Sequence, residues 1–121
     1  MKKLAISFAL SMLAVASSSV FAADACTGTA GDGTAVSSAS DGTKFVRVGF
    51  TPKCSANVMS KYTDQTTTFA VASGSKKGKN TFVGNTAGGA VKPSGTACSS
   101  SGCTDGEVGT ALTAAEGMAS S

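Results

Sequence analysis

The sequence predicts a small, mainly β domain: an antiparallel, sandwich-like sheet stapled by disulfides, with a short helix near the C-terminus. Three observations predict this class. Gly, Ala, Ser and Thr fill 58 of the 99 positions from Ala23 onward, whereas Ile, Leu, Val and Phe supply only 13. Short Thr- and Val-rich segments alternate in polarity and are separated by glycine turns, as in strands. Four cysteines provide the covalent links that small domains with thin cores commonly need.

Residues 1–22 have the pattern of a secretory signal peptide. Two lysines follow Met1, and residues 4–16 are a short apolar stretch. Small residues lie three and one positions before a cleavage site after Ala22. The apolar stretch is shorter than the roughly 20 residues that a membrane-spanning helix requires. The sequence therefore predicts a leader and a single β-rich domain, residues 23–121, with Gly/Ser/Thr-rich ends and no transmembrane segment.

The four cysteines are expected to form two disulfides, because an even number of thiols in an exported chain is typical of a disulfide framework. The favoured pairing joins Cys26 to Cys54 and Cys98 to Cys103, since the CSSSGC segment can close through a glycine-containing turn. The nested pairing, Cys26–Cys103 with Cys54–Cys98, remains open because it would restrict the unfolded chain more.

The expected strands follow in chain order. Residues 44–53 form the clearest one, with Val and Phe side chains alternating before a closing proline, and residues 55–62 extend the sheet. Residues 66–73 and 80–84 form a hairpin around a glycine–lysine turn. Residues 90–92 form a short further strand that Pro93 stops.

The C-terminal segment 108–118 is ambiguous. Val108, Leu112 and Ala115 fit one side of a short helix, but three glycines weaken it. The Gly/Ser/Thr-rich ends are expected to become ordered only where a disulfide holds them.

The residue content argues against an enzyme. Histidine is absent, which removes the Ser–His–Asp and Cys–His arrangements. The carboxylates lie mostly beside Gly or Thr in turn-like segments, so no catalytic residue and no cofactor site is expected. A closed zinc site normally uses paired short spacings, and only Cys98 and Cys103 are close in sequence. We therefore expect no metal site.

Lys76, Lys77 and Lys79 cluster at the expected hairpin tip. They resemble a phosphate loop only superficially, because Asn80 stands where that loop needs Ser or Thr. The lysines are candidates for contact with an anionic surface or glycan; the alternative is a solvated turn whose charges discourage edge pairing. Two of the basic residues belong to the leader, so the remaining chain is nearly neutral, and sequence-specific nucleic-acid binding is not expected.

These features predict an exported, non-enzymatic protein of the periplasm, cell surface or extracellular space. Sheets of small residues with few charges have edges that other chains can complete. The first expectation is therefore a structural protein that self-associates as a subunit of a fibre, a pilus-like filament or a matrix. The alternative is a monomeric secreted binding module, such as an inhibitor or an adhesin-like factor.

Overall fold

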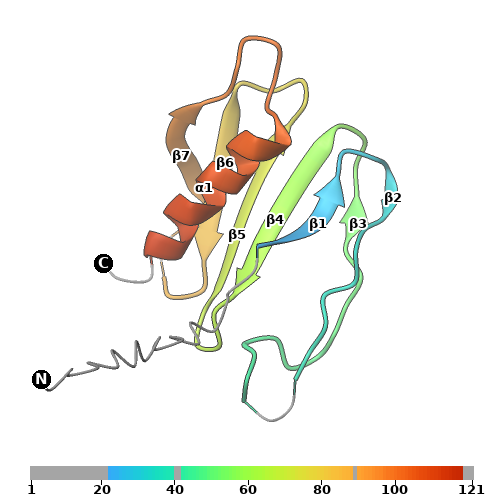
Figure 1. The fold of residues 1–121 in the computed structure, drawn as a ribbon, viewed down its shortest axis with the longest axis vertical. Helices are drawn as coiled ribbons and strands as arrows, with labels where there is room; N and C mark the ends of the chain where they lie inside the picture. Colours follow the sequence, from blue (N-terminus) through green and yellow to red (C-terminus); the bar gives the residue numbers. More distant parts are fainter. Residues whose placement is uncertain (1–21, 40–41, 89, 119–121) are drawn as a thin grey trace, which may run out of the picture.

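The computed structural model describes residues 22–39, 42–88 and 90–118. It confirms a mainly β, antiparallel domain with two disulfides and a C-terminal helix: a five-stranded sheet of order β1-β4-β5-β6-β7, with α1 across one face (Figure 1). A separate two-stranded sheet pairs β2 with β3. The bounds are β1 (Ala23–Thr27), β2 (Gly31–Asp32), β3 (Lys53–Cys54), β4 (Val58–Asp64), β5 (Phe69–Ser75), β6 (Asn80–Asn85), β7 (Lys92–Ala97) and α1 (Asp105–Gly117).

Two parts of the sequence prediction concern the leader and the membrane. Residues 1–21 of the predicted leader lie outside the described residues, so the leader stays a prediction. Among the described residues, no helix is both long and apolar enough to cross a membrane.

The predicted hairpin of residues 66–84 is confirmed as β5 and β6, which pair from Ala70 with Asn85 to Gly74 with Thr81. The extension predicted for residues 55–62 is β4, which pairs with β5 along its whole length. These three strands form the centre of the sheet.

The prediction of a strand over residues 44–53 is wrong. Only β3 at its end is a strand, and Phe50 makes one isolated bridge to Val36. The segment belongs to an irregular hairpin, described for residues 33–39 and 42–52, whose first part is rich in Ser and Ala. The amides of Phe45 and Val46 bond to the Asp64 carboxylate instead of a neighbouring strand. An alternating pattern gives a strand only where a partner strand is available.

The prediction that Pro93 stops a strand is also wrong, because β7 begins at Lys92 and continues through Pro93 to Ala97. Strand β7 is an edge of the sheet, where proline is tolerated because only one side of the strand needs donors. Its register with β6 shifts between the pairs Asn80–Ala97 and Phe82–Pro93, and Gly95 has a φ of 87°. This edge is therefore bulged.

The core lies between α1 and the sheet. Val108, Leu112 and Ala115 are buried on the inner side of the helix, as the sequence pattern indicates. They pack against Met59, Val83 and small residues of β5. A Cβ at Gly74 would lie only 3.1 Å from Val108 Cγ2, so the missing side chain lets α1 approach the sheet closely. Tiny residues thus make a dense core with few large side chains.

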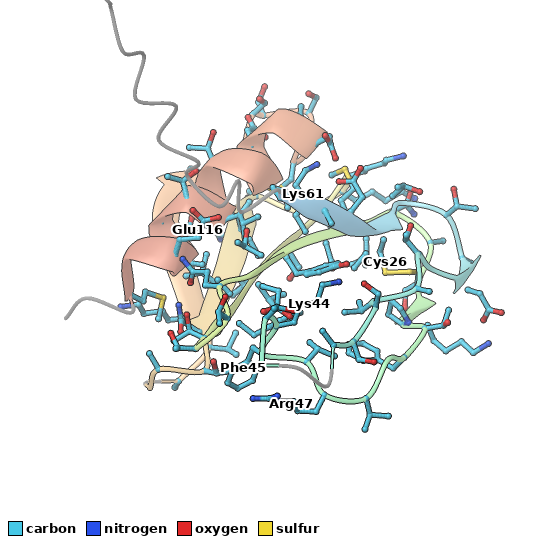
Figure 2. The ribbon with its side chains drawn as sticks, turned by 60° about the horizontal axis from the view of Figure 1, so that its bottom comes forward. Cys26, Lys44, Phe45, Arg47, Lys61 and Glu116 are labelled. Carbon is cyan, nitrogen blue, oxygen red and sulfur yellow. A yellow bond between two sulfur atoms is a disulfide. The ribbon has the colours of Figure 1, made fainter. Side chains whose placement is uncertain are left out.

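The described residues of this irregular hairpin, 33–39 and 42–52, are hereafter the arm. The arm lies on the side of the sheet away from α1 (Figure 2). The Cys26–Cys54 disulfide holds its base against β1, and Thr34 N–H donates to Ala25 O at 3.0 Å. The arm therefore covers part of the β1 and β4 half of the sheet's second face. No other described segment covers the β5 and β6 half, where Val71 and Phe82 are exposed.

Candidate functional site

Both disulfides of the favoured pairing are present, and the nested alternative is wrong. Cys26 and Cys54 have Cα atoms 5.7 Å apart, and Cys98 and Cys103 have Cα atoms 4.7 Å apart. The first bond attaches the arm to the sheet, and the second closes the loop before α1. All four sulfurs are engaged in bonds within the chain.

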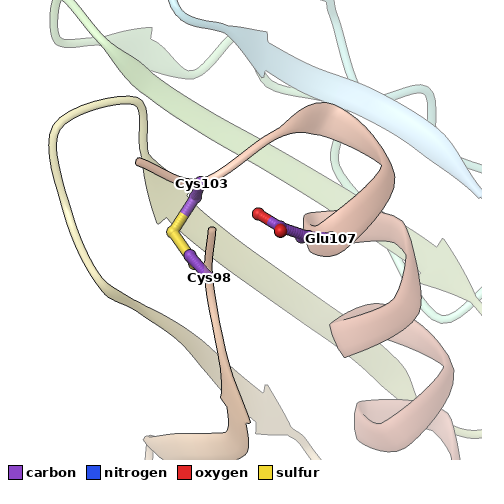
Figure 3. Close-up of side chains that lie close together, drawn as sticks. All are labelled: Cys98, Cys103 and Glu107. Carbon is purple, nitrogen blue, oxygen red and sulfur yellow. A yellow bond between two sulfur atoms is a disulfide. The ribbon is translucent and has the colours of Figure 1, made fainter. Parts of the chain in front are cut away.

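The loop before α1 brings Cys98, Cys103 and Glu107 together (Figure 3). The two sulfurs are bonded to each other and are not thiolate ligands. The carboxylate of Glu107 accepts from Ser99 Oγ at 2.5 Å and from the Thr104 amide at 2.8 Å. These bonds hold the pKa of the Glu107 carboxyl below its usual value, through Ser99 first. The cluster organises the start of the helix and does not have the donors of a metal centre in this oxidised state.

Asp64 at the end of β4 anchors the arm. Its two carboxylate oxygens accept from the amides of Phe45 at 2.6 Å and Val46 at 3.1 Å, and Thr66 N–H adds a third bond at 3.1 Å. Burial raises the pKa of the Asp64 carboxyl. The three amides, helped by the Lys44 charge, outweigh burial and leave that pKa lower than usual.

Lys61 of β4 connects β1 to α1. Its ammonium pairs with Asp24 and lies 3.1 Å from a carboxylate oxygen of Asp105. The side chain passes Gly109 of α1, whose Cβ position would be 3.8 Å from Lys61 Cδ. The hydrogen bond to Asp24 raises the pKa of Lys61 against the opposing effect of burial, and Asp105 adds to the rise.

The remaining described carboxylates are also engaged within the molecule. Asp32 pairs with Lys53, and Glu116 accepts from Thr63 Oγ1 at 2.6 Å. Asp41 lies outside the described residues. Every described carboxylate therefore has a structural partner, whereas no salt bridge within the described ranges involves Arg47, Lys76, Lys77, Lys79 or Lys92.

The structure places the three predicted anion-contact lysines in the exposed β5–β6 turn but does not gather them into one site. Lys76 lines a depression beside the start of α1, with Met59 and Cys103 among its other lining residues. Lys79 lines a separate groove on the opposite side of the sheet. Lys76 and Lys79 therefore contribute to different surfaces.

The uncovered half of the sheet bears an apolar surface, hereafter the open face, formed by Phe69, Val71, Phe82 and Val91. Phe82 is 43% exposed, Val71 36% and Val91 74%. Phe69 stacks on Tyr62, with ring centroids 5.2 Å apart. Exposed apolar side chains that gather on one face of a sheet indicate an interaction surface more than scattered ones do.

A groove of about 290 Å³ lies where the open face meets the β5–β6 turn. Phe82 and Val58 supply apolar surface, Ser73 and Ser75 supply hydroxyls, and Lys79 supplies an ammonium group. The register agrees with this arrangement, because Ser75 pairs with Val58 and Ser73 pairs with Phe82.

Sequence reasoning missed the open face and the Asp64 anchor. The alternation of Phe69, Val71 and Ser73 marks one face of a strand, but it does not tell whether that face is covered. Asp64 precedes a Gln–Thr turn and looks like any solvated turn residue. Its partners lie 18 and 19 positions away along the chain.

Comparison with known proteins found no matching family model, no matching curated protein and no matching solved structure.

Proposed function

We propose that this protein is an exported, non-enzymatic binding module whose open face docks a partner outside the cytoplasm. The observation that carries the proposal is the uncovered apolar half of the sheet, where Val71 and Phe82 remain exposed although the other side is packed by α1. The signal-peptide pattern and two disulfides support export to the periplasm, cell surface or medium.

The edges of the sheet are poor sites for an added strand, which supports binding through the open face instead. The outer edge of β1 is partly occupied, because the Ala25 carbonyl accepts from Thr34 of the arm. The outer edge of β7 is interrupted by Pro93 and by the bulge at Gly95. Bulges and prolines are devices that discourage edge pairing.

The charges support a partner with acidic character. The described carboxylates are engaged in internal contacts, whereas Lys79 and Arg47 have no salt bridge within the described residues. A nearly neutral chain thus has positive charge available for a partner.

A capture experiment with the oxidised protein tests the proposal. Immobilised protein should retain a defined component of the producing culture, and Val71→Asp should abolish retention because a carboxylate in an apolar interface is costly to desolvate. Thr110→Asp, on the exposed side of α1, is the matched control and should retain the component. Equal retention by both variants would remove the open face from the proposal.

A self-assembling structural subunit is the second candidate, and the arm favours it. Val48 is 80% exposed and Phe50 is 49% exposed, and both belong to the arm. Contact between the arm of one copy and the open face of another would join two different surfaces, and such contacts build open filaments. Sedimentation velocity over a concentration series tests this candidate against the monomeric binding module. The unmodified protein should assemble as its concentration rises and Val48→Asp should not, whereas a monomer at every concentration contradicts the candidate.

A further inference from the structure

We infer that the groove between the open face and the β5–β6 turn binds an acidic sugar, a carboxylated ring of an extracellular glycan. This inference rests on the proposed binding function and names the chemistry of its ligand. The residues that carry it are Phe82, Lys79, Ser73, Ser75 and Asn80, all of which line the groove.

Charge indicates that the ligand is an anion. Lys79 is exposed and has no salt bridge within the described residues, and no carboxylate lines the groove. Lys77 lies in the same turn and is also exposed. A carboxylate entering the groove therefore meets positive charge with no competing acid, an arrangement that favours charge-assisted hydrogen bonds.

The other lining groups indicate a ligand that is both apolar and rich in hydroxyls. A sugar ring has a C–H face that packs on an aromatic ring, and Phe82 leaves 43% of its surface available. Ser73 and Ser75 point to the same side of β5 as the groove and can exchange hydrogen bonds with sugar hydroxyls. The Asn80 amide adds a donor and an acceptor at the rim.

The size of the groove suits a short saccharide. Its volume of about 290 Å³ lies just below the range of small-ligand sites, which span about 300–1,000 Å³. The groove is open and not enclosed, so a ring within a chain can enter without a free end. Among the lining residues Phe82 is the single aromatic one, whereas single-stranded nucleic acid is normally bound by successive stacking side chains.

Isothermal titration of the oxidised protein with a galacturonic acid trisaccharide tests the inference. The matched ligand is the methyl ester of that trisaccharide, which keeps the rings and removes the charge. We expect the acid to bind and the ester to bind at least fivefold more weakly. In a two-dimensional NMR spectrum, the acid should shift the amides of Ser73, Ser75 and Asn80.

Three variants locate the site. Lys79→Gln should weaken binding about three- to tenfold, and Phe82→Leu, which keeps apolar bulk, should weaken it by a similar factor through loss of the ring. Lys92→Gln is the matched control, because Lys92 is exposed and pairs with Val83, which faces α1. Unchanged affinity in the Lys79 and Phe82 variants overturns the inference.

Further outcomes test the ligand class and separate this inference from the proposed function. Equal affinity for a single-stranded DNA of matched charge would overturn the sugar assignment in favour of a general polyanion surface. If the trisaccharide does not bind while Val71→Asp still abolishes capture, the inference fails and the proposed function stands. If capture does not depend on Val71, the proposed function fails at its own test.

Discussion

At the scale of single residues, one carboxylate and one glycine fix the local structure on either side of the sheet. Asp64 holds the arm through three amide hydrogen bonds. Gly102 has a φ of 116°, and a Cβ there would lie 1.7 Å from the Lys76 carbonyl oxygen. Only glycine fits such a position without moving the backbone.

Acid should release the arm. Because the pKa of the Asp64 carboxyl is lowered on folding, its stabilising contribution is complete above the ordinary value of 3.8. It is lost as the pH falls from there through the folded pKa. An NMR titration should show the amides of Phe45 and Val46 following this protonation. Asp64→Asn should cost about 1 kcal/mol and remove the titration; an unchanged titration would contradict the anchor.

Replacing Gly102 should be far more damaging than replacing another glycine nearby. We expect Gly102→Ala to lower the free energy of unfolding by about 2–4 kcal/mol, because both the positive φ and the backbone contact oppose a side chain. Apart from the backbone of α1 itself, none of the described residues lies within 4 Å of the Cβ position of Gly106. Gly106→Ala should instead stabilise the protein by about 0.5–1 kcal/mol. Denaturant unfolding measures both, and equal effects would refute the steric argument.

At the scale of elements, α1 forms despite three glycines because its start is well capped and its inner side is buried. Thr104 and Glu107 make a reciprocal capping box, and Val108, Ala111, Leu112 and Ala115 lie against the sheet. The spacing of these buried residues is visible in the sequence. The preference of glycine for other conformations is outweighed by packing, which the sequence does not show.

Removing the cap should weaken the helix measurably. Thr104→Ala should cost about 1 kcal/mol because the Glu107 amide loses its side-chain acceptor. Thr110→Ala, on the exposed side of the same helix, should change stability by less than about 0.5 kcal/mol. Thermal or denaturant unfolding distinguishes the two; a Thr104 variant as stable as the control would show that the cap contributes little.

At the scale of the whole molecule, the two disulfides stabilise different parts of the structure. Cys98–Cys103 fixes the entry to α1, and Cys26–Cys54 joins the arm to the five-stranded sheet. The core between α1 and the sheet contains few large side chains, so covalent links make a large share of the stability of such a domain.

Loss of the longer disulfide should release the arm before the sheet. In the loop-entropy model, closure of a loop with 28 residues of separation contributes about 3.5 kcal/mol. The double variant Cys26→Ser with Cys54→Ser should therefore have a free energy of unfolding lower by this amount. In its NMR spectrum the amide signals of the arm should lose their chemical-shift dispersion. The amides of β5 and α1 should remain protected from hydrogen exchange when those of the arm no longer are. Uniform loss of protection would show that the arm and the sheet unfold together.

The sequence determined the fold class, the central hairpin and the basic turn, because each depends on local features such as alternation and glycine turns. It favoured the observed disulfide pairing through the five-residue separation of Cys98 from Cys103 but left the nested pairing open, and the structure decided between them. The sequence predicted a strand at residues 44–53 wrongly, since pairing depends on a neighbour that local alternation does not specify. Only the tertiary structure decided that Lys76 and Lys79 lie on opposite sides of the sheet. It alone left Val71 and Phe82 exposed, because α1 packs on the opposite face of the sheet and the arm covers only the β1 and β4 half of their own face.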